Sequence, residues 1–273
     1  MTGDQMKKHF AAGIDIGSVA AKSVIRNTDE RSTIAQCVIP TGWNVAEAGS
    51  QVLDLACAQA GIARGSLCRT VVTGYGRVSL PFADKSVTEI TCHALGAHSL
   101  FPGTRTILDI GGQDSKAISI DADGKVIDFA MNDKCAAGTG RFLQVLSGIL
   151  GVSLDELSVA ASAGTPASIS SMCAVFAETE IVGLLARGEK PGNVAAGVFL
   201  SIARRMRALT ARIPLLEECT FTGGLATSTV FGKILAKELG VTVNVPEKPQ
   251  TTGALGAALA AEQEYLRSQG ENT

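Results

Sequence analysis

Apolar residues in this chain form short strand-like runs and helical stripes, and these follow the same order twice. The predicted elements of the first half are strands at Ala12–Ile16, Lys22–Arg26 and Thr33–Ile39, a helix at Asn44–Ala60, a strand at Arg69–Thr73 and a helix over about Thr88–Leu100. Asn44 is a favourable N-cap residue, so we expect the first helix to begin there.

Pro102 and Gly103 punctuate the chain, after which the pattern starts again. The predicted elements of the second half are strands at Thr106–Ile110, Lys116–Ile120 and Val126–Met131, helices at Thr139–Leu150, Cys173–Ala186 and Asn193–Arg212, a strand at Cys219–Thr222, a helix at Ser228–Leu239, a strand at Val241–Val245 and a helix at Thr251–Ser268. Three strands followed by helices, repeated within 273 residues, predict two similar α/β lobes.

Composition narrows the class of protein further. Apolar residues make up 46% of the chain, aromatic residues only 4%, and 30 residues are glycine, which favours an aliphatic core with many tight turns. The net charge of −2 gives no electrostatic reason to expect nucleic acid or an anionic membrane as a partner. The sequence has no run of about 18 apolar residues, and Asp15 interrupts its early apolar stretch, so we expect a cytoplasmic protein with neither membrane span nor export signal.

Each half carries the same acidic, glycine-rich turn after its first strand: Asp15-Ile16-Gly17-Ser18 and Asp109-Ile110-Gly111-Gly112. Glycine lets backbone N–H groups approach a phosphate, and a carboxylate at a strand end can hold hydrated Mg²⁺. One such turn is weak evidence, because Asp-Gly turns also connect ordinary hairpins. Two of them at equivalent positions predict that a triphosphate is clamped from both sides, with Asp15 and Asp109 on Mg²⁺ and its waters.

Further residues complete the predicted nucleotide site. Gln113 or Asp114 would orient the attacking water. Lys22 would neutralise phosphate charge, although an ordinary exposed lysine on the second strand is an equally simple reading. Gly223 and Gly224 follow a strand and suit close approach of an adenosine. The small residues of 252–258 are interpreted as helix packing, and neither a P-loop nor a Rossmann glycine pattern occurs.

The seven cysteines divide by context. Five of them lie in or beside apolar patterns and are expected to be small core residues: Cys37, Cys57, Cys68, Cys92 and Cys219. Cys135 and Cys173 lie in polar stretches ahead of helices, where thiolates and an anionic cluster are favoured. Two thiolates cannot complete a cubane cluster, but a two-fold dimer that contributes both from each subunit can. The alternative is one buried cysteine and one exposed thiol.

The phosphate and adenosine motifs resemble those of the acetate kinase, sugar kinase, heat-shock chaperone and actin superfamily. In this resemblance the phosphate motifs are Gly13–Lys22 and Leu108–Lys116, the adenosine motif is Phe221–Ala226, and the connecting segments are Asn132–Phe142, which contains Gly138, and Thr251–Ala261. The resemblance implies the actin-like ATPase fold: two similar lobes, each a mixed sheet flanked by helices, with ATP or ADP in the cleft between them. Residues 1–102, completed by 251–273, would form the first lobe and residues 103–250 the second.

Six strings in order make the resemblance more specific: GIDIGSVAAKSV, VVTGYGR, DIGGQDSK, NDKCAAGTGRF, ISSMCAVFAETE and FTGGLA. They are similar to the ATP-dependent activators (component A) of 2-hydroxyacyl-CoA dehydratases and to the ATPase subunits of benzoyl-CoA reductases. That family implies a homodimer with one 4Fe-4S cluster held by Cys135 and Cys173 of both subunits. It also implies an electron taken from ferredoxin or flavodoxin and passed, with ATP hydrolysis, to a partner iron–sulfur dehydratase or reductase.

Two rival functions remain at this point. A small-molecule kinase of the same superfamily would need an acceptor-binding insertion, for which 273 residues leave little room. A nucleotide-sensing regulatory ATPase would need no cluster. The kinase would also leave Cys135 and Cys173 without a role.

Overall fold

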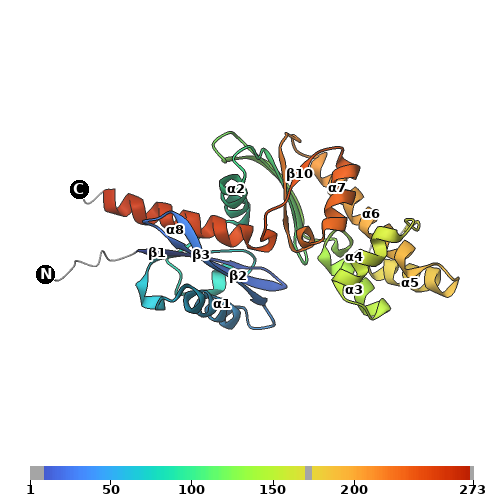
Figure 1. Ribbon diagram of the computed structural model, residues 1–273, viewed down its shortest axis with the longest axis horizontal. Helices are drawn as coiled ribbons and strands as arrows, with labels where there is room; N and C mark the ends of the chain where they lie inside the picture. Colours follow the sequence, from blue (N-terminus) through green and yellow to red (C-terminus); the bar gives the residue numbers. More distant parts are fainter. Residues whose placement is uncertain (1–8, 170–173, 271–273) are drawn as a thin grey trace. The chain divides into compact units, whose positions relative to one another are not determined.

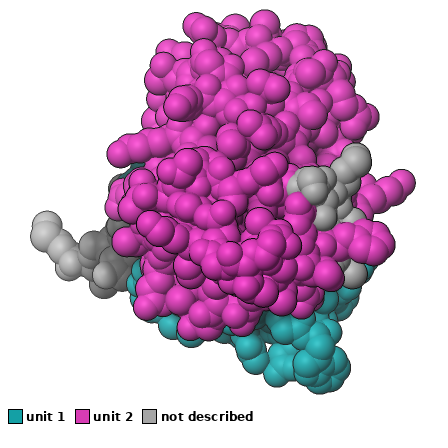
Figure 2. Space-filling model, turned by 90° about the vertical axis from the view of Figure 1, so that its right-hand side faces the viewer, with its two compact units in different colours: residues 1–99, 250–273 teal, residues 100–249 magenta. Residues whose placement is uncertain are grey.

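The computed structural model describes residues 9–169 and 174–270, and it divides into two compact units. Unit 1 consists of residues 1–99 and 250–273, and unit 2 of residues 100–249, so the C-terminal segment belongs with the N-terminal part of the chain (Figure 2).

Unit 1 is built on a five-stranded mixed sheet, whose first three strands are labelled in Figure 1. The strands follow the order β3-β2-β1-β4-β5. Its elements are β1 (Phe10–Ile16), β2 (Ala20–Asn27), β3 (Ser32–Pro40), α1 (Val45–Ala60), β4 (Leu67–Thr73), β5 (Lys85–Ser86), α2 (Glu89–Leu100) and α8 (Thr252–Gly270), with short 3₁₀ helices at Arg64–Ser66 and Arg77–Ser79. The first three strands are antiparallel neighbours, and β4 runs parallel to β1.

The central strand β1 is buried along its whole length, because helices cover both faces of the sheet. Alternate residues point to opposite faces: Ile14 packs in the cluster with α1, whereas Ala11 packs with residues of α2 and α8. Asn44 caps α1 as predicted, with its side chain accepting a hydrogen bond from the N–H of Glu47.

Unit 2 repeats this topology, with the sheet order β10-β9-β6-β7-β8. Its elements are β6 (Thr106–Ile110), β7 (Ser115–Ile120), β8 (Val126–Asn132), α3 (Gly140–Leu150), α4 (Leu154–Ala163), α5 (Ala174–Ala186), α6 (Pro191–Thr210), β9 (Cys219–Gly223), α7 (Thr229–Leu239) and β10 (Val243–Asn244), with 3₁₀ helices at Ala136–Gly138 and Gly224–Thr227. A further 3₁₀ helix, Pro249–Thr251, spans the boundary between the two units. When the strands are counted from the start of each unit, both sheets have the same order: third, second, first, fourth, fifth. The predicted repeat and the predicted α/β fold class are confirmed.

Most element predictions are confirmed within a few residues, and a few elements differ. Helix α4 was not predicted, although Ser153 and Glu156 form the capping box that begins it. The 3₁₀ helix Gly224–Thr227 was not predicted either, whereas α7 begins at Thr229, within one residue of the predicted Ser228. The strand predicted at Val241–Val245 is reduced to two residues. The predicted start of α5 at Cys173 lies outside the described residues.

No single helix in the described ranges is long and apolar enough to cross a membrane. Helices α3 and α4 pass that test only as a pair, by length and composition, and are bent by 88° relative to each other.

Candidate functional site

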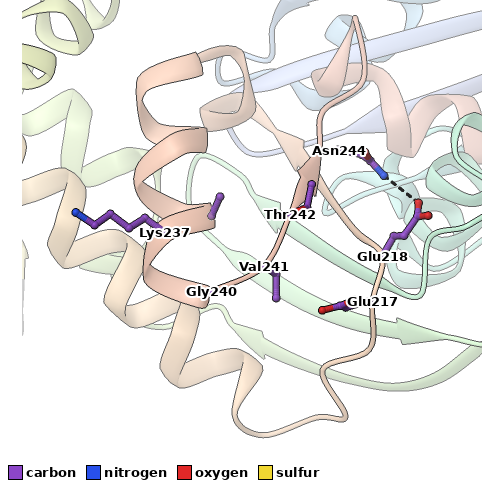
Figure 3. A pocket seen from close by; sticks show the side chains of 8 residues that line it. Glu217, Glu218, Lys237, Gly240, Val241, Thr242 and Asn244 are labelled. Carbon is purple, nitrogen blue, oxygen red and sulfur yellow. Dashed lines mark hydrogen bonds between the residues drawn. The ribbon is translucent and has the colours of Figure 1, made fainter.

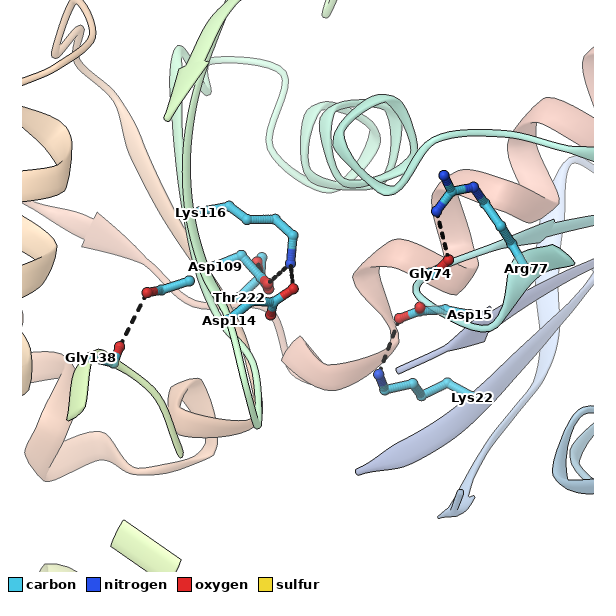
Figure 4. A network of polar contacts seen from close by, with 10 residues as sticks. Asp15, Lys22, Gly74, Arg77, Asp109, Asp114, Lys116, Gly138 and Thr222 are labelled. Carbon is cyan, nitrogen blue, oxygen red and sulfur yellow. Dashed lines mark hydrogen bonds and ion pairs between the residues drawn. The ribbon is translucent and has the colours of Figure 1, made fainter. Parts of the chain in front are cut away.

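The first turn (residues 17–19) joins β1 to β2 in unit 1 and is flanked by an ion pair. Asp15 and Lys22 lie opposite each other in the antiparallel register, and Lys22 Nζ is 3.1 Å from Asp15 Oδ2 (Figure 4). The side chains of Lys22 and Asp15 are only 16% and 8% exposed. The interpretation of Lys22 as an ordinary exposed lysine is therefore wrong.

Two glycines and a histidine surround the Asp15 carboxylate. Gly74 has a φ of +87°, and a Cβ there would lie 2.4 Å from Asp15 Oδ1. A Cβ on Gly253, near the start of α8, would lie 3.0 Å from Asp15 Oδ2 and 3.1 Å from Nε2 of the buried His93. The backbone thus approaches the carboxylate where only glycine fits. No role was predicted for Gly74 or His93, although the Gly-Tyr-Gly string at Gly74 was a signal, and Gly253 was interpreted only as part of a helix-packing segment.

The first turn itself is shaped by backbone hydrogen bonds. Gly17 N–H donates to the Ala20 carbonyl at 3.0 Å, and Thr41 Oγ1 donates to the Gly17 carbonyl at 2.7 Å. A Cβ on Gly17 would lie 3.0 Å from Lys22 Nζ, so glycine keeps the space beside the ammonium open. Ser18 is partly exposed next to it.

The second turn (residues 111–114) joins β6 to β7 in unit 2 and has the same cross-strand pair with more partners. Asp109 lies opposite Lys116 in the register, and Lys116 Nζ is 3.5 Å from Asp109 Oδ2. Lys116 is buried and also lies 2.7 Å from Oδ2 of Asp114, which is partly exposed (Figure 4). Thr222 Oγ1 donates to Asp109 Oδ1 at 2.8 Å. Gln113, at the tip of the turn, is exposed.

Unit 2 brings most of its predicted site residues together. Gly223, at the end of β9, has a φ of +90°, and a Cβ there would lie 2.9 Å from Asp109 Oδ1 and 2.4 Å from the Ile110 carbonyl. A Cβ on Gly111 would lie 2.5 Å from Asp114 Oδ1. Ser115 Oγ donates to the carbonyl of Gly138 at 3.1 Å, which joins the connecting segment to the same group. Gly112 belongs to the second turn, and Gly224 follows Gly223 as the first residue of the 3₁₀ helix Gly224–Thr227.

The small residues at the start of α8 pack against neighbouring backbone, as predicted. A Cβ on Gly256 would lie 1.7 Å from the Cys92 carbonyl of α2. A Cβ on Gly13 of β1 would lie 2.1 Å from the Ala254 carbonyl. These contacts explain the glycines by close packing.

Cys135 precedes the 3₁₀ helix Ala136–Gly138 and is partly exposed. The Asn132 side chain brackets its backbone, donating from Nδ2 to the Cys135 carbonyl at 2.9 Å and accepting from the Cys135 N–H at 3.1 Å. Cys173 lies outside the described residues. Within the ranges that are described, no three His, Cys, Asp or Glu side chains gather as a metal site.

The other five cysteines behave as structural thiols. Cys57, Cys92 and Cys219 are buried, and burial raises the pKa of Cys92 to about 12 and that of Cys219 to about 11. Cys37 and Cys68 are half-buried rather than buried, with their Sγ atoms 3.1 Å from Gln59 Oε1 and 3.0 Å from the Phe10 carbonyl. Their expected core role therefore holds only in part.

A cavity of about 720 Å³ lies at the other end of β9 from Gly223 (Figure 3). It is lined by Glu217, Glu218, Ala236, Lys237, Gly240, Val241, Thr242 and Asn244. Asn244 Nδ2 donates to Glu218 Oε2 at 3.3 Å. None of the predicted site residues lines this cavity.

Comparison with known proteins gives this geometry a family context. The chain is 42% identical over 263 residues to the 2-hydroxyisocaproyl-CoA dehydratase activator of Clostridioides difficile, covering 96% of this chain and 98% of that protein. It is 44% identical over 253 residues to the activator of lactoyl-CoA dehydratase of Anaerotignum propionicum, covering 92% and 97%. The solved structure of the C. difficile activator with bound ADPNP superimposes with a TM-score of 0.91 at 41% identity, covering 96% of this chain and 97% of that one.

These similarities confirm the predicted resemblance to dehydratase activators and the actin-like ATPase fold. Residues 12–261, which include both Asp–Lys turns, match the BadF/BadG/BcrA/BcrD ATPase family. The chain is an ATPase that belongs to the BadF/BadG/BcrA/BcrD family.

Proposed function

We propose that this protein is an ATP-hydrolysing activator that passes one electron to a partner 2-hydroxyacyl-CoA dehydratase or a related reductase. The single observation that carries the proposal is the duplicated Asp–Lys turn, which stands in a chain similar along almost its whole length to dehydratase activators. A relative of this chain is solved with ADPNP, which supports a nucleotide as the ligand.

The residues of the two turns fit a nucleotide and a hydrated cation. Asp15 and Asp109 are buried carboxylates at strand ends, suited to Mg²⁺, which keeps most of its waters. Lys22 and Lys116 compensate these carboxylates and would also compensate phosphate charge. Ser18 and Gly112 are proposed to offer backbone N–H groups, whereas the N–H groups of Gly17 and Gly111 donate within the turns to the carbonyls of Ala20 and Asp114 and shape them. Magnesium, when bound, would supply charge stabilisation to the transferring phosphoryl group.

The second turn is proposed to carry hydrolysis. Gln113 is exposed at its tip, and Asp114 is held by Lys116 at 2.7 Å. Because phosphoryl transfer depends mainly on positioning and charge stabilisation, orienting the attacking water is sufficient for these side chains. Gly223, Gly224 and Gly138 lie next to Asp109 or Ser115 and are proposed to receive the rest of the nucleotide.

Cys135 is proposed to ligate one 4Fe-4S cluster together with Cys173 and the same pair of a second subunit. A cubane cluster needs four thiolates, and the homodimer would supply them. The partly exposed position of Cys135 and its bracketed backbone suit a ligand role. The cluster would supply the electron, which ferredoxin or flavodoxin would replace. Lowering the reduction potential of a one-electron donor by 100 mV costs about 2.3 kcal/mol, which is within reach of ATP hydrolysis.

The rival readings as a small-molecule kinase or a nucleotide-sensing regulator receive less support. Two relatives that match over almost the whole chain are activators of dehydratases, and the similarity to them leaves no additional segment for an acceptor pocket.

Anaerobic purification tests the proposal. We expect a brown protein with about four irons per dimer, and Cys135→Ser is expected to remove iron and visible absorbance while nucleotide binding remains. Cys37→Ser is the matched control, because Cys37 is also half-buried and its thiol lies in unit 1, hydrogen-bonded to Gln59. A colourless wild-type protein, or full iron content in Cys135→Ser, contradicts the cluster assignment.

A further inference from the structure

The second turn is hydrogen-bonded directly to the start of α3. The N–H of Gly140 donates to the carbonyl of Gly111 at 2.9 Å, and the N–H of Arg141 donates to the carbonyl of Gly112 at 2.8 Å. The first N–H groups of a helix have no partner within the helix, so α3 uses two of them to attach to this turn. A displacement of the turn must therefore move the start of α3 or break these bonds.

A second connection runs from the turn through Ser115 and Asn132. Ser115 follows the turn as the first residue of β7, is buried, and donates from Oγ to the Gly138 carbonyl at 3.1 Å. Asn132, the last residue of β8, lies opposite Ser115 in the sheet register. The Asn132 amide holds both backbone polar groups of Cys135. Ser115 and Asn132 thus sit at one end of the sheet, between the second turn and the cysteine.

The glycine at 138 makes this arrangement possible. A Cβ on Gly138 would lie 2.9 Å from Asn132 Nδ2, so a larger residue would push the amide away from Cys135. The Gly138 N–H also donates to the Cys135 carbonyl at 3.2 Å. The segment 132–138 is therefore folded around the Asn132 side chain. Gly138 and Gly140 are both explained by close approach to neighbouring atoms.

We propose that Ser115 and Asn132 are positioning residues that couple the second turn to Cys135. The inference rests on the proposed function, in which the turn binds phosphate and Cys135 ligates the cluster. A change at the turn on exchange of ADP for ATP then reaches Cys135 along two routes, through α3 and through the Ser115–Asn132 pair. The Asn132 route fixes the backbone of Cys135 and hence the direction of its thiol.

Hydrogen exchange of the iron-loaded protein, followed by mass spectrometry with ADP and with ADPNP, tests this coupling. In the wild type, peptides covering 133–142 are expected to exchange at different rates in the two nucleotide forms. Asn132→Ala and Ser115→Ala are expected to reduce the ratio of these rates by about fivefold, within the range of single-residue coupling effects, and to keep nucleotide binding. Asn132→Asp keeps the acceptor for the Cys135 N–H and is expected to retain part of the ratio.

Two matched controls separate coupling from general loss of a hydrogen bond. Asn44→Ala removes an asparagine that holds Glu47 at the start of α1 in unit 1. Ser119→Ala removes a buried hydroxyl of the same strand β7, which donates to the Pro214 carbonyl at 2.5 Å. In both controls, the ratio of the exchange rates of peptides 133–142 with ADP and with ADPNP is expected to equal that of the wild type.

A wild-type ratio in both Asn132→Ala and Ser115→Ala would overturn the inference and leave the proposed function standing. A wild-type protein without iron, or without any nucleotide effect on 133–142, would overturn the proposed function and the inference together. If Asn132→Ala does not fold, Asn132→Asp and Ser115→Ala decide the question by the same ratio.

Discussion

The two units carry the same turn with different surroundings, and the difference indicates how their tasks are divided. In each, an aspartate on the first strand lies opposite a lysine seven positions later. In unit 1 the lysine has one carboxylate partner and the aspartate is enclosed by glycine backbone. In unit 2 the lysine lies between two carboxylates, and the aspartate also accepts from Thr222.

Aligning the two turns by their aspartate and lysine shows which residues differ between them. Gln113 and Asp114 of the second turn stand where the first turn has Val19 and Ala20. In the proposed function both turns bind phosphate, and the second turn adds the amide of Gln113 and the carboxylate of Asp114, which we expect to orient water. The second turn is also the one bonded to α3 and, through Ser115, to the Cys135 segment. Binding alone is expected of unit 1, and hydrolysis and its transmission of unit 2.

Asp109→Asn is expected to have the largest effect on this comparison, lowering the rate of ATP hydrolysis by about 10²- to 10³-fold. The amide keeps the hydrogen bond from Thr222 but loses the charge that faces Lys116 and the cation. Turnover measured at saturating MgATP, together with the visible spectrum of the cluster, checks this. Wild-type turnover would mean that the second turn is only a hairpin.

Lys116→Met is expected to destabilise the fold by about 3 kcal/mol, because it leaves two carboxylates near each other with one of them buried. Lys22→Met is the matched variant in unit 1 and is expected to cost less, since Lys22 is more exposed and has a single acidic partner. Urea unfolding of both variants gives the comparison. Equal losses would remove the electrostatic distinction between the two turns.

Gln113→Ala is expected to lower kcat by about tenfold to a hundredfold, with little change in KM, because its side chain is proposed to orient water and not to hold nucleotide. Val19→Ala truncates the equivalent position of the first turn and is expected to leave kcat unchanged. A larger effect from Val19→Ala than from Gln113→Ala would reverse the assignment of hydrolysis to unit 2.

A smaller effect, on the free energy of unfolding at alkaline pH, is expected from one buried cysteine in each unit. The folded pKa is raised to about 12 for Cys92 in unit 1 and to about 11 for Cys219 in unit 2, above the value of 9.0 for an exposed thiol. Each contribution to stability is fully present below pH 9 and is lost as pH rises towards the folded pKa.

The free energy of unfolding should therefore fall by about 1.4 kcal/mol per pH unit for each thiol between pH 9 and 11. Cys92→Ala or Cys219→Ala should make that slope shallower by one thiol's share, after allowance for the methyl-sized loss of packing. An unchanged slope in both variants would show that neither thiol is held protonated by burial.

The sequence predicted the repeated strands and turns well because period and turn chemistry are local properties. The Asp–Lys pairing was also within reach, since a spacing of seven in two hairpins fixes the register of each pair. From the sequence, the two aspartates were assigned a role but were not paired with the lysines, and Lys22 was given two interpretations.

The remaining contacts depend on elements that are distant in sequence. Gly74, His93 and Gly253 meet around Asp15 only after β4, α2 and α8 have packed on the first sheet. Likewise, the bond from Gly140 to Gly111 joins a helix start to a turn almost thirty residues earlier. No periodicity encodes such contacts, so glycine clusters indicated where the backbone packs closely without indicating its partner.

The most direct test of ATP-driven electron transfer is the accessibility of the cluster in each nucleotide state. Under anaerobic conditions, the rate at which an iron chelator removes iron is measured with ADP, with ADPNP and without nucleotide, together with the midpoint potential of each form. A faster rate with ADPNP than with ADP, and a shifted potential, are predicted. Identical rates and potentials in all three states would contradict the claim that ATP acts through the cluster.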